Sequence, residues 1–150
     1  MDRFVSNFTN RIDAKGRISI PASFRATLAR GGFEGLFLHP SLELPALDCG
    51  GSALLSEIDG LLGRLAPYST ERDALSTALL GVSEILKVDA EGRVMLTESL
   101  KAYAGVKDDA TFVGQGSKFQ IWEPERFAAH LAASRESLRA FRRQSADAAS

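Results

Sequence analysis

The sequence predicts an α+β fold built from two internal repeats, with short helices among the strands and a further helix at the C-terminus. Three observations lead to this prediction. The segment DAKGRISIPASFR at 13–25 is nearly repeated as DAEGRVMLTESLK at 89–101. Apolar and polar residues alternate over Ile18-Ser19-Ile20, directly after the first Gly-Arg pair, as they do in a half-buried strand. The segments 52–80 and 124–143 instead carry apolar residues at helical spacing.

The two copies align at an offset of 76 positions, from Asp13 to Asp89. Because only two copies are present, the pattern indicates a duplicated module rather than a solenoid. One charged position differs in sign, since Lys15 is replaced by Glu91. The other aligned pairs include Gly16 with Gly92, Arg17 with Arg93, Ile18 with Val94, Ile20 with Leu96, Phe24 with Leu100 and Arg25 with Lys101.

The first module predicts a strand over 10–13, a tight turn over 14–17, a strand over 18–20 and a helix over 22–28. Gly16 supplies the positive φ angle that such a turn favours. A proline directly precedes the helix and a pair of glycines follows it, and these residues mark its two ends.

The second module predicts the same elements in the same order. Thr97 is the expected N-cap of its helix, and Gly105 is expected to end that helix after Ala104. Each module closes with a pair of strands joined by a short turn. The expected pairs are 35–39 with 42–44 in the first module and 111–115 with 118–122 in the second.

Two helices are expected between the modules, one over the leucine-rich stretch from Leu54 to Leu65 and one starting at Thr70, with Pro67 ending the first. The leucine stripe fits either the core or an interface between subunits. Pro124 opens the C-terminal helix, and a small, polar tail is expected over 144–150. The helix carries an apolar stripe of Phe127, Leu131, Leu138 and Phe141.

Charge is unevenly distributed although the net charge is only −1. Residues 1–30 hold six basic and two acidic side chains, whereas residues 31–70 hold one basic and five acidic ones. A locally positive surface attracts phosphate even on a neutral protein, because screening limits the field to about 8–10 Å. The arginines of 135–143 fit either a solvated helix face or a second patch that follows phosphates.

Several classes of function lack support in the sequence. The single cysteine, Cys49, allows no intramolecular disulfide and is expected to be a loop-borne thiol in a reducing compartment. His39 and His130 lack metal-ligand spacing, so a surface or interface role is expected for them. No nucleophile elbow or nucleotide-binding glycine pattern occurs. We therefore expect no enzyme activity, cofactor, metal or small-molecule substrate. With no signal peptide or membrane span, we expect a cytoplasmic protein.

Three motifs together resemble a known family. They are Asp13-x-Lys-Gly-Arg-Ile-x-Ile-Pro21, its degenerate repeat Asp89-x-x-Gly-Arg, and Val113-Gly-Gln-x-x-Lys-Phe-Gln-Ile-Trp122. Over about residues 1–128, the chain resembles MraZ, a family of bacterial transcriptional regulators encoded at the head of the division and cell-wall gene cluster. The resemblance implies two SpoVT/AbrB-like domains in a β-rich, swapped-hairpin barrel. These domains span 7–54 and 83–126, with a helical connector at 55–82 and a C-terminal helix and tail at 127–150.

The resemblance further implies a homo-oligomeric ring, associated with the nucleoid, that binds direct repeats of double-stranded DNA in its own promoter. Repression of that promoter is the expected effect. The planar fork of Arg17 matches guanine O6 and N7 or a phosphate, whereas Lys15 and Arg11 are expected to bind phosphates. The candidate DNA-contacting residues are Arg17, Lys15, Gly16, Arg11, Asp13 and Arg3.

The two copies are not expected to share one role. Glu91 would repel a phosphate, so we expect copy one to keep the DNA face and copy two to keep the architecture, with Arg93 paired to Asp89. For Arg3 and Arg25 the choice between a structural role and DNA contact stays open, and Trp122 is expected to pack rather than stack on bases. Two alternatives stand beside DNA regulation: a ring-forming scaffold in cell division, and an antitoxin-like regulator.

Overall fold

The computed structural model describes residues 2–149. Its strands and helices follow the order that the two modules predict, and β1 and β5 are the equivalent strands ahead of the two turns. The elements are β1 (Asn7–Arg11), β2 (Arg17–Ser19), α1 (Ala22–Arg30), β3 (Leu36–Pro40), β4 (Leu47–Gly50), α2 (Ser52–Gly63), α3 (Thr70–Leu79), β5 (Glu84–Leu86), β6 (Arg93–Met95), α4 (Glu98–Ala104), β7 (Asp109–Gly114), β8 (Phe119–Trp122) and α5 (Pro124–Ala149).

The strands form a six-stranded antiparallel sheet in the order β1-β7-β8-β4-β3-β5 and a separate two-stranded sheet of β2 and β6. The two repeats exchange strands. β1 of the first repeat pairs with β7 of the second, and β5 of the second pairs with β3 of the first. Over residues 2–149 the large sheet stays open, with β1 and β5 at its edges, so the expected closed barrel is not present.

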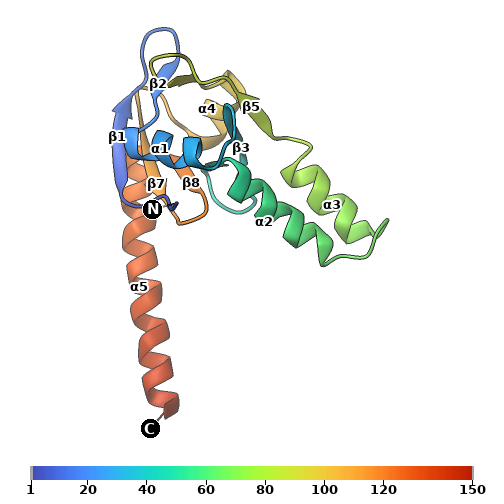
Figure 1. Ribbon diagram of the computed structural model, residues 1–150. Coiled ribbons are helices and arrows are strands. Elements are labelled where there is room, and N and C mark those ends of the chain that lie inside the picture. Colours follow the sequence, from blue (N-terminus) through green and yellow to red (C-terminus); the bar gives the residue numbers. More distant parts are fainter. Residues whose placement is uncertain (1, 150) are drawn as a thin grey trace.

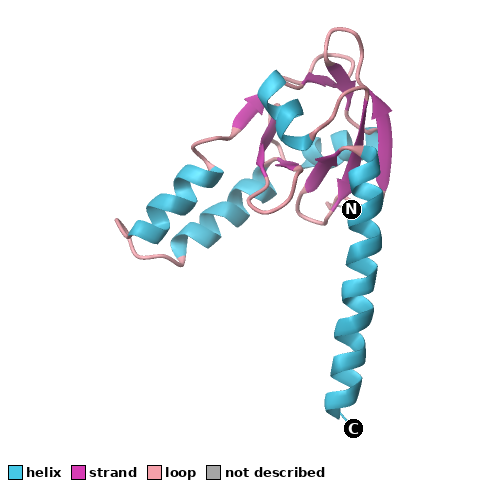
Figure 2. Ribbon diagram, turned by 180° about the vertical axis from the view of Figure 1, so that it is seen from behind, coloured by secondary structure: helices cyan, strands magenta, loops and turns pink. Residues whose placement is uncertain are grey.

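The two helical segments leave the body of the molecule in different directions (Figure 1). The α2–α3 pair extends from one side of the sheet. α5 begins beside β7 and then continues as a long rod beyond the sheet, and the reverse view in Figure 2 shows the same divergence. The loops that precede β2 and β6 lie at the opposite end of the body from the tip of α5.

The main core joins both repeats around one aromatic ring, Phe24 of α1, which is 1% exposed. Its ring centroid lies 5.3 Å from that of Phe4, 4.9 Å from Phe119 and 6.5 Å from Phe112. Phe112 and Phe119 belong to the second repeat. The burial of one repeat therefore depends on the other, as expected for halves too small to bury a sufficient core separately.

A smaller core lies beneath α2. Leu54, Ile58 and Leu62 recur at intervals of four residues and are buried together with Phe37 and Leu79. Most of the leucine stripe is therefore core. Leu61, in contrast, is 41% exposed.

The predicted helix ends of the second module are confirmed. The hydroxyl of Thr97 accepts a hydrogen bond from the Leu100 N–H at 3.3 Å, and Gly105 adopts the left-handed conformation with φ of 70°. These are the side-chain N-cap and glycine C-cap that satisfy the unpaired groups at helix ends.

The expected strand over 42–44 is wrong. The Ser41 N–H donates to the Ala46 carbonyl at 2.9 Å, which closes a loop, and Leu42 is 55% exposed. Pro45 has no N–H to donate to a sheet ladder. The partner of β3 is instead β4, whose residues are all buried.

Two further expectations are corrected. The tail over 144–149 is helical, because it contains several alanines and no glycine or proline, so α5 continues to Ala149; Ser150 lies outside the described residues. Cys49 is not on a loop. It is fully buried in β4, and this burial raises the pKa of its thiol well above the usual range.

Candidate nucleic-acid interface

The first turn, residues 13–17, is organised by a single carboxylate. One oxygen of Asp13 accepts hydrogen bonds from the backbone N–H groups of Lys15 and Arg17, both at 2.9 Å. Its other oxygen accepts from Arg17 Nε at 2.8 Å. Gly16 has a φ of 84°, a conformation that other residues rarely adopt. The motif spacing therefore follows from the geometry of the turn.

The second turn, residues 89–93, has the same construction. Asp89 accepts from the backbone N–H groups of Glu91 and Arg93 at 2.9 Å and from Arg93 Nε at 2.9 Å. Gly92 has a φ of 78°. The duplicated motif thus predicts a duplicated structure, atom for atom in these contacts.

Both aspartates have a pKa below the ordinary value. For Asp13 the backbone N–H of Arg17 is the largest cause, and partial burial acts in the opposite direction. For Asp89 the backbone N–H of Arg93 has the corresponding effect. The hydrogen bonds favour the charged carboxylate, so each turn is most stable when its aspartate is ionised.

This depression of the pKa predicts a pH dependence. A carboxyl whose pKa is lower in the folded state stabilises the protein fully above the unfolded pKa of about 3.9, and this contribution is lost as the pH falls through the folded value. In urea unfolding between pH 6 and pH 2, Asp13→Asn combined with Asp89→Asn is expected to flatten the acid limb of the stability curve. A limb of unchanged slope would contradict the prediction.

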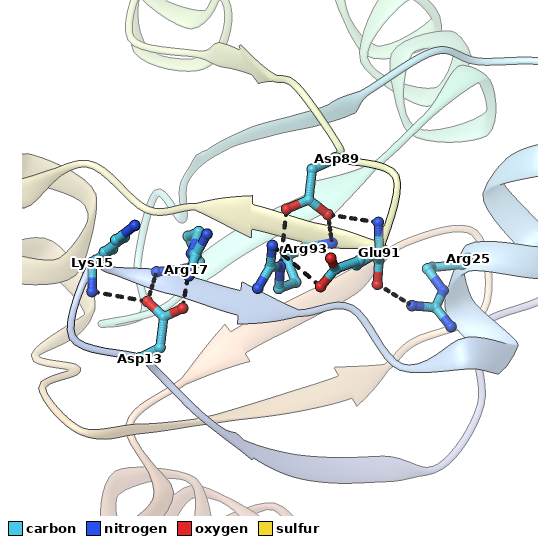
Figure 3. Close-up of polar contacts among 7 residues, drawn as sticks. All are labelled: Asp13, Lys15, Arg17, Arg25, Asp89, Glu91 and Arg93. Carbon is cyan, nitrogen blue, oxygen red and sulfur yellow. Dashed lines mark hydrogen bonds and ion pairs between the residues drawn. The ribbon is translucent and has the colours of Figure 1, made fainter.

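The β2–β6 ribbon carries both arginines on one face (Figure 3). Ile18 and Val94 pair across the ribbon and are each 1% exposed, so they point into the core. Because side chains alternate along a strand, Arg17 and Arg93 lie on the outer face. Arg17 is opposite Met95, which is 54% exposed, and Arg93 is opposite Ser19. A two-stranded antiparallel ribbon is one of the shapes that fits a DNA major groove.

The two arginines differ in how far they are neutralised. Arg93 contacts two carboxylates, Asp89 at 2.9 Å and Glu91 at 3.3 Å, and these contacts raise its pKa, chiefly through the side-chain bond to Asp89. Arg17 pairs with Asp13 alone, through Nε. Within residues 2–149, its terminal nitrogens have no hydrogen-bond or ion-pair partner, and neither has the exposed amine of Lys15. The basic side chains of the first turn itself therefore keep their charge, whereas Arg93 in the second turn is offset by two carboxylates. The second turn gains a cation from outside, because Arg25 of α1 donates to the Glu91 carbonyl at 3.2 Å.

Comparison with known proteins supports the motif-based resemblance. The sequence profile of a family described as "MraZ protein, putative antitoxin-like" matches residues 79–147. "Transcriptional regulator MraZ" of Beijerinckia indica is 69% identical over 144 residues, which cover 96% of this chain and 88% of that protein. The chain belongs to the MraZ family. The MraZ of Methylocella silvestris is 65% identical over the same coverage, and that of Rhizobium meliloti is 40% identical over 91% of this chain and 93% of that protein.

The structure adds a residue to the first turn of this MraZ chain that sequence reasoning missed. Lys101 of α4 lies close to Gly16: a Cβ atom on that glycine would sit 3.9 Å from Lys101 Nζ. Glu98 also pairs with this amine at 2.9 Å. In the second turn the equivalent Arg25 covers Gly92 and donates to the Glu91 carbonyl at 3.2 Å. The alignment of Arg25 with Lys101 was the available signal, because exchanged repeats place equivalent helices on each other's turns.

Two other candidate residues lie at different ends of β1. Arg11 is exposed and ends β1, two residues before Asp13. Arg3 is exposed near Gly116, because Phe4 bridges to Gly116 at the far end of the strand. The structure brings Arg11 toward the first turn and leaves Arg3 away from it. DNA contact by Arg3 would need a second contact region.

The remaining residues that the sequence singled out are packed inside the MraZ chain. Trp122 is 2% exposed and donates to Gln120 at 2.9 Å, so it is a core residue. His39, expected at a surface or interface, is 3% exposed, and its Nδ1 lies 2.8 Å from the Pro40 carbonyl. His130 is partly buried and stacks on Trp122. Among the helices within residues 2–149, none combines the length and apolar character needed to cross a bilayer.

Proposed function

We propose that this MraZ-family protein regulates transcription by binding double-stranded DNA through the outer face of the β2–β6 ribbon. The names of its relatives support the regulatory role. The observation that carries the DNA-binding proposal is the first turn, where the terminal nitrogens of Arg17 and the nearby amine of Lys15 have no hydrogen-bond or ion-pair partner among residues 2–149. The phosphates along the edges of a DNA major groove attract cations, and a narrow ribbon that holds such cations in fixed positions can enter the groove.

Each residue of the first turn has a distinct part in this proposal. The bond from Arg17 Nε to Asp13 fixes the guanidinium, so that its outer fork is available to a guanine or a phosphate. Gly16 lets the backbone of the turn approach the DNA closely. Lys15 and Arg11 add charge around it, which positions the ribbon without reading sequence. Lys101 lies beside Gly16, but its charge is offset by Glu98 at 2.9 Å.

The ribbon of one copy offers few contacts, so we propose that several copies act together in a ring on direct repeats. Linked sites raise affinity through effective concentration, provided that their spacing matches the DNA. The exchange of β1 and β5 between the repeats supports the swapped-hairpin description of the fold. The proposed target is the promoter of the protein's own division and cell-wall cluster, with repression at the nucleoid in the cytoplasm as the outcome.

An antitoxin-like regulator is the second candidate, and the wording of the matched family profile favours keeping it. Antitoxins of related fold use a segment beyond the DNA-binding domain to hold a toxin. α5 is such a segment, but it is helical to Ala149 rather than unstructured. DNA binding through the ribbon is common to both candidates.

The salt dependence of DNA binding tests the proposal. Fluorescence anisotropy with a labelled duplex from upstream of the gene is expected to give a log–log slope of about −0.9 for each phosphate contact. Lys15→Ala should reduce the magnitude of the slope by about one contact, whereas Arg64→Ala, on the distant α2–α3 pair, should not change it. Absence of binding by the unmodified protein would instead support a scaffold without a DNA role.

The second turn provides its own test. Glu91→Lys is expected to leave the affinity for the same duplex within about threefold, because the proposed DNA contacts come from the first repeat. The substitution adds positive charge at the position equivalent to Lys15. An affinity gain of tenfold or more would mean that the second turn also faces DNA, and the proposed division of roles would then fail.

A further inference from the structure

The first turns of α5 are fixed on the body of the protein. The Glu123 carboxylate accepts from the backbone N–H groups of Glu125 and Arg126 at 2.9 and 3.0 Å, which caps the helix. His130 stacks on Trp122 with ring centroids 4.5 Å apart. Arg126 also donates to the Ala104 carbonyl at 3.3 Å. The direction in which the helix leaves the sheet is therefore determined.

The distal half of α5, residues 134–148, has no body of protein beneath it (Figure 1). It nevertheless keeps an apolar stripe: Leu138 is 58% exposed and Phe141 is 64% exposed. Arg135 and Arg142 border the stripe and have no hydrogen-bond or ion-pair partner within residues 2–149. An amphipathic helix buries its apolar face against a partner, so this stripe lacks the partner that its pattern predicts.

A groove of complementary character lies beside the α2–α3 pair. It has a volume of about 410 Å³ and runs between the α2–α3 pair and the loop after β3. Leu42 and Leu61, on its rim, are 55% and 41% exposed. Its acidic residues are Glu43 and Glu57 on the surface and the buried Asp48. The apolar lining consists mainly of Leu42, Leu54, Ile58, Leu61, Leu75 and Leu79.

We propose that the distal half of α5 from one copy of this chain docks in the α2–α3 groove of a second copy. The apolar stripe would cover Leu42 and Leu61, as helices do in groove-type recognition. Arg135 and Arg142 would face the exposed Glu43 and Glu57 of the groove. The lysine that lines the groove, Lys118, pairs with Asp48 at 3.2 Å, so the charge left on the groove is acidic and the two surfaces match in sign as well as in polarity.

The helix cannot fill the groove of its own copy. α5 contains no proline after Pro124 and no glycine, the residues at which helices bend, and its base is held by Trp122 and Glu123. In Figures 1 and 2 it points away from the α2–α3 pair. The contact is therefore between copies.

The proposed contact uses two different surfaces of one chain. Such a heterologous contact adds copies in one direction, and the assembly closes into a ring when the rotation between copies allows it. The inference deepens the proposed function by naming the contact that would hold a ring together. Its test uses no DNA, so it fails or succeeds separately from the DNA-binding proposal.

Two complementary variants test the contact by sedimentation velocity. Leu138→Asp with Phe141→Asp removes the helix surface, and Leu42→Asp with Leu61→Asp removes the groove surface. All four side chains are exposed, so both variants are expected to fold, which circular dichroism checks. Each variant alone should need at least about a 30-fold higher concentration to assemble, the effect of losing one strong interface side chain.

The mixture gives the decisive result. The helix-defective copy keeps an intact groove and the groove-defective copy keeps an intact helix, so an equimolar mixture is expected to form dimers and stop there. Arg143→Ala, on the opposite side of α5 from Leu138 and Phe141, should assemble like the unmodified protein. A mixture that stays monomeric, or a groove variant that still assembles fully, would overturn the proposal, and the second result would indicate that α5 pairs with another α5.

Discussion

Arg17→Ala is expected to lower the affinity for promoter DNA by about 5- to 150-fold, the effect of losing one bidentate base contact of about 1–3 kcal/mol. The physical reason is the geometry of the guanidinium: Nε donates to Asp13, and the two outer nitrogens have no partner in the described part of the chain. Fluorescence anisotropy at fixed salt measures the effect. Analytical sedimentation of the same sample verifies that the oligomer is unchanged.

The second repeat supplies a matched control in the same chain. Arg93→Ala removes an equivalent Nε bond, to Asp89, from an equivalent turn. Its loss should affect the stability of the turn as much as the loss of Arg17 does, yet reduce DNA affinity by less than about threefold. Equal losses of affinity in the two variants would show that both arginines contact DNA. No loss in either would place the DNA face outside the ribbon.

Phe24→Ala is expected to lower the free energy of unfolding by about 3–5 kcal/mol, the usual cost of truncating a buried aromatic residue. The Phe24 ring lies at the centre of an aromatic cluster drawn from both repeats, with Phe119 at 4.9 Å and Phe4 at 5.3 Å. The cavity would open where the two repeats meet. Urea unfolding measures this change, and a single transition is expected because neither repeat has a core of its own.

Phe8→Ala is the graded control for this prediction. Phe8 touches the same cluster, with its ring 5.6 Å from that of Phe24, but it is 39% exposed. Its truncation removes less area from the core and is expected to cost about 1 kcal/mol. If Phe24→Ala cost no more than Phe8→Ala, the aromatic cluster would not be the main link between the repeats.

The sequence by itself determined the features that depend on neighbours within a few residues. The Asp-x-x-Gly-Arg turn is one example, because Asp13 bonds to Lys15 and Arg17 only two and four positions away. The cap of α4 at Thr97 is another, since its partner, Leu100, is three positions away. Gly105 also belongs to this class, because its left-handed φ of 70° depends only on the local backbone and favours glycine.

The expectation that Lys15 and Arg17 face DNA came from the resemblance of the motif to the family and from the change of sign at Glu91, and it stays a prediction. The expected strand over 42–44 was wrong because Pro45, next to the alternating Leu-Glu-Leu stretch, has no N–H to donate to a sheet. The strand that pairs with β3 is β4, and this pairing is visible only in the tertiary structure. The full extent of α5 was not predicted because Ser145 and Asp147 have low helix propensity, whereas the structure shows that the alanines between and after them continue the helix to Ala149.

Only the tertiary structure decided which strand of one repeat pairs with which strand of the other. β1 and β7 meet across about a hundred residues, in a register that no local interaction sets. That exchange places Lys101 beside the first turn and Arg25 over the second, and it sets Arg17 and Arg93 on one face of one ribbon. Local chemistry fixes a turn within five residues, whereas the burial of apolar side chains from distant segments fixes what surrounds it.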